Sequence, residues 1–212
     1  MNYKEIMDIP LFSNISEENL RKLLKCVNAY EKTYFANEFI EINELIGIVL
    51  QGRVAMQSEN YDGNVSTLTD LSAGDLFGET FACAGEENKV VMFQALSDTK
   101  ILALNYSKVF NTCTVVCPFH HRLVENMVKE IARKNYMLMK RQEIISQRTL
   151  RAKILTYLYQ LPRENDAVYI PISRNEMSYY LAADRSALSR ELSKMQADGV
   201  INFINKNTVK II

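Results

Sequence analysis

The sequence predicts an α+β protein whose strands and helices occupy separate parts of the chain. Three observations support this class. Short β-rich runs separated by Gly, Asp and Asn fill residues 34–104, the 30 residues 118–147 contain no Gly and no Pro after the first, and helical patterns alternate with short strands in 148–212. With 48% hydrophobic and 24% charged residues, the 212-residue chain has an ordinary globular composition, which excludes wholesale disorder.

Export and membrane signals are absent from the sequence. No apolar run approaches the ~18–20 residues of a membrane span, and the opening segment MNYKEIMDIPLF lacks the apolar stretch and cleavage site of a signal peptide. We therefore expect a cytoplasmic protein without membrane contact, whose four Cys are reduced thiols.

Charge is distributed unevenly along the chain. Residues 1–118 hold 9 Lys or Arg and 16 Asp or Glu, residues 119–147 hold 6 and 3, and residues 148–212 hold 10 and 6. The net charge of zero therefore hides an acidic front and a basic tail. This asymmetry suggests that the tail meets a polyanion, although a modestly basic segment is often only a solvated surface.

The first 104 residues predict helix followed by sheet. The stretch to Val27 has helical spacing, and Ser16 is placed to cap it. Asp62-Gly63 is a strong hairpin signal, and Gly52 separates two strands. Many short strands at near-regular spacing predict an antiparallel sandwich or barrel. The predicted strands are residues 39–42, 46–50, 53–57, 65–71, 90–96 and 100–105.

The stretch 118–147 predicts one long helix. At ~1.5 Å per residue it spans about 45 Å, and Pro118 suits its first turn. Apolar residues recur along it at three-, four- and seven-residue steps, which is typical of a two-stranded coiled coil with polar breaks near Lys134 and Arg141. The alternative is an amphipathic helix packed on its own domain. The residues of this candidate dimer seam are Val124, Met127, Ile131, Leu138 and Ile145.

The tail predicts a winged helix-turn-helix. A helix over 151–161 stops before Pro162, and a short strand is expected at 169–173. Ser173 and Glu176 form a capping-box pattern, Asp184 caps the next helix, and Gly199 ends it. The last residues read as a hairpin turning at 205–207. Helix, strand, helix, turn, helix and hairpin is the order of a winged helix-turn-helix.

The whole chain resembles the Crp/Fnr family of bacterial transcription regulators. The segments LQGRV (50–54) and SAGDLFGE (72–79) resemble its β-roll of the cyclic-nucleotide-binding type, a double-stranded β-helix related to the jelly roll. ISRNEMSYYLAADRSALSREL (172–192) resembles its helix-turn-helix, and CPFHHRLVEN (117–126) resembles the start of its dimer helix. The resemblance implies a sensory β-roll in 1–117, a dimerisation helix in 118–147 and a DNA-binding domain in 148–212.

The second helix of the tail is the expected recognition helix, because its first turns would face base edges in the major groove. Arg190 is the strongest candidate by resemblance, since Arg can bond both acceptors of a guanine. Many family members carry Glu where Ser186 stands, so the operator is expected to depart from the usual half-site. The candidate base-reading residues are Arg185, Ser186, Ser189 and Arg190. The alternative is that Ser173 and Asp184 act only as helix caps, and that Arg185 and Arg190 are only solvated charges.

The preceding helix opens on Ser173, Arg174 and Asn175, which are candidates to hold phosphate through backbone amides and short polar side chains. A dimer places two recognition helices about 34 Å apart, so the expected partner is a palindromic site in double-stranded DNA. RNA polymerase is a candidate further partner, although contacts with it leave no readable motif.

The resemblance also points to an effector pocket. In cyclic-nucleotide binders of this type, a Gly-Glu pair meets phosphate and ribose, and an Arg with a Ser or Thr neutralises the phosphate. Gly78-Glu79 is present, but Lys89 and Val90 stand at the Arg-Ser position, which removes a bidentate fork and a hydroxyl donor. Cyclic AMP itself is therefore not the expected ligand; the pocket holds another small molecule or nothing. The candidate pocket residues are Phe77, Gly78, Glu79, Thr80, Lys89 and Val90.

Thiols and histidines form a second candidate sensor, for zinc or haem, although the cofactor is unknown. Cys113, Cys117, His120 and His121 follow C-x3-C-x2-H-H, but adjacent His side chains diverge by ~100° on a helix, and free Cys is commonly a packed apolar residue. Cys26 is alone near the N-terminus, which disfavours an iron–sulfur cluster.

Enzyme motifs are missing. The sequence contains no phosphate loop, no G-x-S-x-G elbow and no H-E-x-x-H helix. We therefore expect a homodimeric DNA-binding regulator with an effector sensed by the β-roll, and not an enzyme. The alternative is a metal- or haem-dependent redox or gas sensor on the same scaffold.

Overall fold

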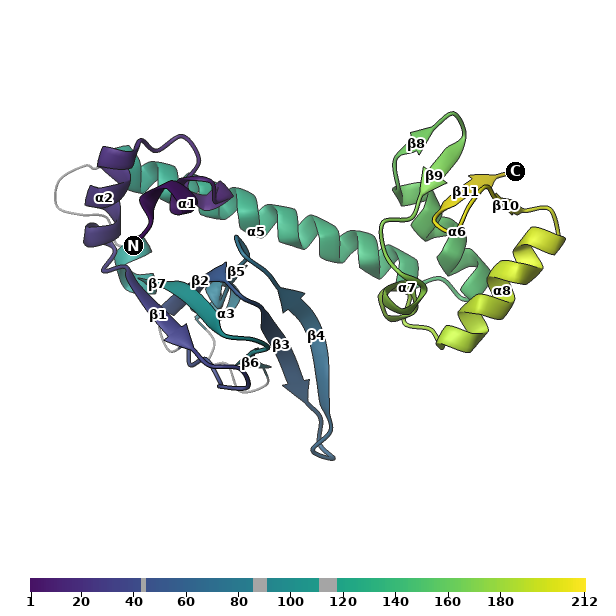
Figure 1. The fold of residues 1–212 in the computed structure, drawn as a ribbon, viewed down its shortest axis with the longest axis horizontal. Coiled ribbons are helices and arrows are strands. Elements are labelled where there is room, and N and C mark those ends of the chain that lie inside the picture. Colours follow the sequence, from purple (N-terminus) through teal and green to yellow (C-terminus); the bar gives the residue numbers. More distant parts are fainter. Residues whose placement is uncertain (43–44, 86–90, 111–117) are drawn as a thin grey trace. The chain divides into compact units, whose positions relative to one another are not determined.

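The computed structural model describes residues 1–42, 45–85, 91–110 and 118–212. It confirms the predicted α+β class (Figure 1). The chain forms two compact units, Met1–Ile131 and Ala132–Ile212. The boundary between them falls inside helix α5 (Pro118–Ile145), within the segment predicted as a dimerisation helix.

Helices open the N-terminal unit. They are α1 (Tyr3–Met7), the 3-10 turn η1 (Pro10–Phe12) and α2 (Glu17–Cys26). Leu20, Leu23 and Leu24 of α2 are buried in the same cluster as Leu123 and Met127 of α5. Ser16 occupies the N-cap position of α2, but its side chain makes no capping hydrogen bond, so the predicted cap is only positional.

Two antiparallel sheets follow these helices, with strand orders β1-β7-β2-β5 and β4-β3-β6. Their inner side chains form one buried cluster that includes Val49, Val54, Phe93 and Ile101. The strands are β1 (Tyr30–Tyr34), β2 (Leu45–Gln51), β3 (Val54–Glu59), β4 (Val65–Leu71), β5 (Leu76–Phe77), β6 (Val91–Ala95) and β7 (Thr99–Asn105). Short helices α3 (Glu79–Ala84) and α4 (Tyr106–Phe110) follow β5 and β7.

The strand predictions hold with three differences, of which one is that the short strand β5 was not predicted. Residues 39–42 were predicted as a strand, but the structure shows only an isolated bridge between Phe39 and Gln94. Strand β1 was not predicted, yet it pairs with β7 from Tyr30 to Tyr34. The hairpin at Asp62-Gly63 is confirmed, because this turn joins the antiparallel pair β3 and β4, whose register shifts once between Met56 and Gln57.

The C-terminal unit has the element order of a winged helix-turn-helix. Apolar side chains of its helices, including Leu158, Met177, Leu188 and Met195, form its core. The predicted strand at 169–173 is displaced, since β9 ends at Tyr169. The elements after α5 are α6 (Leu150–Gln160), β8 (Arg163–Glu164), β9 (Ala167–Tyr169), α7 (Arg174–Tyr180), α8 (Arg185–Ala197), β10 (Ile201–Phe203) and β11 (Thr208–Ile211), with sheet order β10-β11-β9-β8.

Candidate DNA-binding interface and sensory domain

Helix α7 begins with the predicted capping box. The Oγ of Ser173 accepts a hydrogen bond from the backbone N–H of Glu176 at 3.2 Å, and the Glu176 carboxylate accepts from the N–H of Ser173 at 2.7 Å. Hydrogen bonding of the Glu176 carboxylate to the backbone N–H of Ser173, and then to the Ser173 side chain, lowers the pKa of Glu176. The first turn of α7 is therefore fixed by its own sequence.

Helix α8 is capped by Asp184. Its Oδ1 accepts from the N–H of Ala187 at 2.8 Å and from the Ser186 hydroxyl at 2.6 Å, and these bonds lower the pKa of Asp184. Leu188, Leu192 and Met195 are buried on the inner side of α8. The exposed face at the start of α8 carries all four predicted base-reading residues: Arg185, Ser186, Ser189 and Arg190.

The two serines of this face make local hydrogen bonds. Ser186 donates to Asp184, and Ser189 donates to the carbonyl of Arg185 at 3.1 Å. A hydroxyl that donates its hydrogen retains lone pairs, so both serines are disposed to accept from a base amino group. Within the described part of the chain, Arg185 and Arg190 form no ion pair or hydrogen bond through their guanidinium groups.

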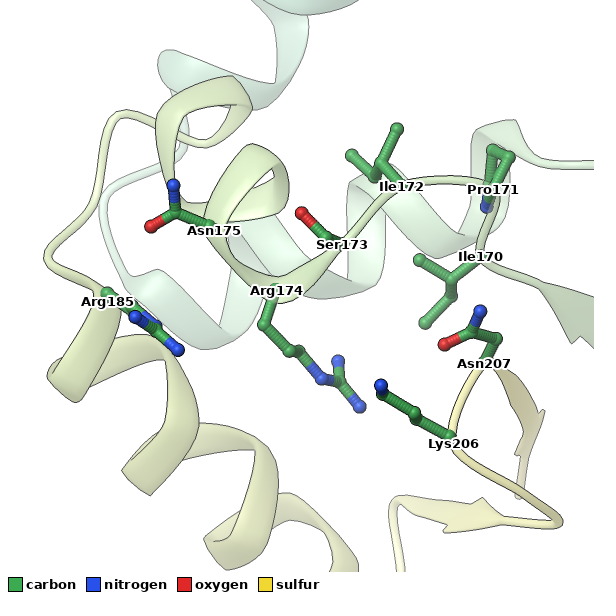
Figure 2. Close-up of a pocket in the computed structure, with 9 residues that line it drawn as sticks. All are labelled: Ile170, Pro171, Ile172, Ser173, Arg174, Asn175, Arg185, Lys206 and Asn207. Carbon is green, nitrogen blue, oxygen red and sulfur yellow. The ribbon is translucent and has the colours of Figure 1, made fainter.

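A hollow of about 350 Å³ lies beside this face, between the start of α7, the start of α8 and the β10–β11 turn. Figure 2 shows Arg174, Arg185 and Lys206 with their charged ends directed toward the hollow. Arg174 packs its guanidinium over the ring of Phe203, at 4.7 Å from the centroid, and partial burial lowers its pKa. The lining residues are Ile170, Pro171, Ile172, Ser173, Arg174, Asn175, Arg185, Lys206 and Asn207.

Lys206 was not among the predicted site residues. It lies on the exposed turn between β10 and β11, in the segment that was predicted only as a turn. The sequence signal was a single Lys at the tip of a hairpin that follows the two helices. The sequence alone does not show that Lys206 belongs to the site, because its place beside the start of α7 depends on how the hairpin folds.

Basic side chains, among them Arg151 and Arg141, stabilise α7 and α8 within this unit. Arg151 on α6 bonds the carboxylates of Glu191 at 2.7 Å and Asp198 at 2.6 Å, which raises the pKa of its guanidinium. Arg141 donates to the carbonyl of Tyr179 at 3.2 Å. The exposed face of α8 is thus presented on a framework tied by charge-assisted bonds.

Helix α5 carries the predicted dimer seam, and one of its members is misplaced. Met127 is fully buried in the core of its own unit, so its side chain is not available to a partner chain. Val128, which was not predicted, is 58% exposed. With Val128 in place of Met127, the apolar positions follow a regular alternation of four- and three-residue steps, interrupted by Asn135 and Gln142: Val124, Val128, Ile131, Leu138 and Ile145.

The predicted effector residues occupy different environments. Phe77 is buried among the sheet residues, with its ring 5.1 Å from that of Phe93. Gly78 adopts φ +81°, and Glu79 is 3% exposed, whereas Thr80 is exposed. Lys89 and Val90 lie outside the described residues.

The Cys and His residues do not form a metal cluster in the described residues. His120 is 2% exposed, with Nε2 2.7 Å from the carbonyl oxygen of Val109 and Nδ1 3.9 Å from the sulfur of Cys26. His121 is exposed. The predicted ligands Cys113 and Cys117 lie outside the described residues. The pairing of His120 with Cys26 was not predicted.

Two families match this chain. Residues 39–114 match the cyclic nucleotide-binding domain, and residues 152–212 match the Crp-like helix-turn-helix domain. Together with the winged helix-turn-helix, they define a DNA-binding transcription regulator with a sensor domain of the cyclic-nucleotide-binding type, which is not an enzyme. The chain belongs to the Crp/Fnr family.

Known relatives are distant in sequence. The cyclic AMP receptor protein of Thermus thermophilus is 22% identical over 174 residues, which is 81% of this chain and 76% of that protein. The crystal structure of the Thermus thermophilus catabolite activator protein matches with a TM-score of 0.51 and 20% identity, covering 96% of this chain and 93% of that one. The c-di-GMP responsive regulator CLP of Xanthomonas campestris matches with 0.60 and 16%, covering 93% and 100%. At these identities the structural likeness shows the fold alone. No helix among the described residues is both long and apolar enough to cross a membrane.

Proposed function

We propose that the chain acts as a homodimer that binds a palindromic operator, with a small-molecule effector held by the N-terminal β-roll. In this proposal residues 1–117 sense the effector, residues 118–147 form the dimer helix, and residues 148–212 bind DNA. Because its partner is chromosomal DNA, we place the regulator in the cytoplasm. RNA polymerase is a further partner that this proposal accommodates.

The observation that carries the proposal is the group of cations around the hollow in the C-terminal unit. Arg174, Arg185 and Lys206 approach it from three different elements, and among the described residues none of the three forms an ion pair with a carboxylate. Cations that are unpaired in the free protein favour contact with the DNA phosphates, which supply most of the affinity of such interfaces. We assign Arg174 and Lys206 to phosphates, with Ser173 and Asn175 beside them.

Base reading falls to the exposed face of α8. We propose that Arg190 donates to a guanine, and that Ser186 and Ser189 accept from base amino groups at neighbouring positions. Arg185 lies both on this face and at the hollow, so it is suited to either a base or a phosphate.

The dimer is proposed from the apolar row on α5. Leu138 and Ile145 are 65% and 42% exposed, and they continue the row of Val124, Val128 and Ile131. A second copy of the same helix covers such a row as a coiled coil, and polar residues within the row fix its register.

The effector is proposed to be a molecule other than cyclic AMP. The family's phosphate-binding Arg-Ser is replaced by Lys89 and Val90 in the sequence, so charge-assisted bonds worth ~1.5–3 kcal/mol each are lost. Calorimetric titration with cyclic AMP is expected to show no heat of binding at micromolar ligand. A micromolar dissociation constant would overturn this part of the proposal.

The first experiment is selection of bound fragments from a random DNA pool by the full-length protein. We expect a palindromic sequence to be enriched, and we expect Arg190→Ala to lose preference for one base pair in each half-site, at a cost of about 1–3 kcal/mol. Enrichment of an unpaired, asymmetric site would contradict the dimer, and unchanged preference in Arg190→Ala would contradict its role as a reader.

The phosphate contacts have a matched control within the same hairpin. Lys206→Ala and Lys210→Ala each remove one positive charge, but Lys210 already lies 3.6 Å from the Asp166 carboxylate and is not part of the hollow. We expect Lys206→Ala to reduce the slope of log affinity against log salt by about 1, and Lys210→Ala to leave it unchanged. Equal effects would argue for a diffuse charge rather than a phosphate contact.

A further inference from the structure

A thiol, an imidazole and a carbonyl group lie in line in the N-terminal unit. Cys26 is the last residue of α2, His120 is in the first turn of α5, and Val109 belongs to α4. The Cys26 sulfur is 3.9 Å from Nδ1 of His120, and Nε2 of the same ring is 2.7 Å from the carbonyl oxygen of Val109. Ninety-four positions separate the thiol from the imidazole in the sequence.

The carbonyl group sets which nitrogen of the ring carries a proton. A carbonyl oxygen only accepts hydrogen bonds, so Nε2 of His120 must donate to Val109. In the neutral ring, Nδ1 is then without a proton and faces the Cys26 thiol as an acceptor. Nucleophile, base and a third group that orients the base are the arrangement by which proteins activate cysteine.

The thiol and its base differ in exposure. Cys26 is partly exposed, whereas His120 is 2% exposed and Val109 is fully buried. The imidazole is therefore held by the core, next to a cysteine at the edge of that core.

Cys83 provides an internal contrast. It is exposed on α3, but partial burial of its sulfur and the nearby charge of Glu79 raise the pKa of its thiol. A thiol with a raised pKa is a poor nucleophile near neutral pH, because the thiolate is the reactive form. By exposure alone, Cys83 would be the more reactive thiol. The imidazole beside Cys26 and the raised pKa of Cys83 instead favour reaction at Cys26.

We propose that Cys26 is a reactive thiol that is modified by small oxidants of the hydroperoxide class, with His120 as its base. The thiol proton moves to Nδ1 of His120, and the thiolate sulfur attacks one peroxide oxygen. A sulfur–oxygen bond forms, the oxygen–oxygen bond breaks, and the departing oxygen takes the proton from His120 to leave as water or an alcohol. Sulfur is oxidised by two electrons to the sulfenic acid while the peroxide is reduced.

The test uses the full-length reduced protein in buffer with a metal chelator. Hydrogen peroxide is added with dimedone, which traps sulfenic acids, and the rate of labelling at each cysteine is followed by peptide mass spectrometry. We expect Cys26 to be labelled about tenfold faster than Cys83, since only a few per cent of an unactivated thiol is ionised near pH 7. Labelling at Cys26 no faster than at Cys83 would overturn the proposal without any variant.

A pair of neighbouring variants tests the base. His120→Gln keeps a donor for the Val109 carbonyl but cannot take up the thiol proton, so labelling of Cys26 should fall about tenfold while that of Cys83 stays constant. His121→Gln changes the adjacent exposed imidazole and should alter neither rate. An unchanged or increased rate at Cys26 in His120→Gln would show that the imidazole only packs against the thiol.

Discussion

Gly78 shows how one residue can be required for backbone reasons alone. It adopts φ +81° at the start of α3, where a Cβ would lie 3.0 Å from the carbonyl oxygen of Leu45 and 3.3 Å from the Ile42 side chain. Both the left-handed conformation and the close approach favour glycine. The Gly-Glu motif therefore has a structural requirement whether or not its amides also meet a ligand.

Replacing Gly78 by Ala is expected to lower the free energy of unfolding by about 2 kcal/mol, because the change combines backbone strain with a steric clash. Gly85→Ala is the control, since Gly85 also has positive φ but a Cβ there meets no atom of the described residues within 4 Å. We expect a cost of about 1 kcal/mol for Gly85→Ala. Denaturant unfolding of both variants measures the difference, and equal costs would show that the clash at Gly78 relaxes.

Tyr157 makes the C-terminal unit sensitive to alkaline pH. Its side chain is 5% exposed, and burial raises its pKa to about 12. The unfolded chain loses this proton near pH 10 and the folded chain only near pH 12, so the unfolded state binds fewer protons in between and stability falls as pH rises. We expect a loss of about 1.4 kcal/mol by pH 11.

Denaturant unfolding at pH 8 and pH 11 tests this sensitivity. Tyr157→Phe should lose less stability between the two values than the parent chain does. Tyr169→Phe removes an exposed phenol and should retain the parent's full loss. An undiminished loss in Tyr157→Phe would assign the alkaline sensitivity to other groups.

Single residues also show which parts of the candidate sites could be predicted from the sequence and which could not. The face of α8 was predictable because caps, apolar spacing and Arg190 all belong to one short segment. Met127 was misassigned because three- and four-residue steps fit two neighbouring faces of a helix, and only the core decides between them. Cys26 was read as isolated because its partner His120 is distant in sequence.

At the scale of elements, two serines at N-cap positions differ in structure: Ser173 has Glu176 three residues on, as a capping box requires, whereas Ser16 has Asn19 there. Ser173 and Ser16 both precede a helix with acidic residues in its first turn. The Ser173 side chain caps α7, whereas the Ser16 side chain makes no capping bond to α2. An N-cap serine therefore marks the start of a helix in both cases, but the side-chain bond forms only where the capping box is complete.

Ser173→Ala is expected to destabilise α7 by about 1 kcal/mol, which corresponds to about fivefold faster amide exchange in residues 174–180. Ser16→Ala should leave exchange in residues 17–26 unchanged, because no capping bond is lost. Hydrogen exchange read by mass spectrometry on DNA-free protein measures both. Similar acceleration in the two variants would mean that the hydroxyls act through something other than the cap.

The strands also show how far a local sequence pattern can predict an element. Strands β2, β3, β4 and β7 were predictable from their β-branched and apolar runs. Strand β1 has the sequence YEKTY, and only its last residue is buried, so it lacks an apolar alternation. It becomes a strand because β7 offers a free edge, which is a tertiary cause that a local pattern does not contain.

At the scale of the whole molecule, the two compact units share one helix. Helix α5 is part of the N-terminal unit up to Ile131 and part of the C-terminal unit from Ala132. Its N-terminal residues Leu123 and Met127 are buried in the first core, and Ile144 is buried in the second. The proposed dimer forms when α5 of a second chain covers the exposed apolar row of this helix.

Leu138→Arg is expected to convert the dimer to a monomer, because it places a charge in the middle of the apolar row. Met139→Arg is the matched control: Met139 has a similar exposure of 60% but lies one residue off the row. Analytical ultracentrifugation should show half the parent mass for Leu138→Arg and the parent mass for Met139→Arg. A monomeric parent chain, or a dimeric Leu138→Arg, would contradict the assignment of the row.

The pairing of β1 with β7 also determines how long β1 remains unpaired during biosynthesis. Tyr30 pairs with Ala103, so β1 waits for 73 further residues, or about 4–15 s of translation, before its edge is satisfied. The widest strand pairing described in the helix-rich C-terminal unit joins Ala167 to Lys210, which is a shorter separation, so this unit is expected to fold faster. The chain contains no tryptophan, so one introduced into either unit reports on that unit alone. In stopped-flow refolding, the slower phase is then expected from the tryptophan in the N-terminal unit. During synthesis, the N-terminal unit is therefore the part of the chain that remains unfolded and accessible to chaperones for the longest time.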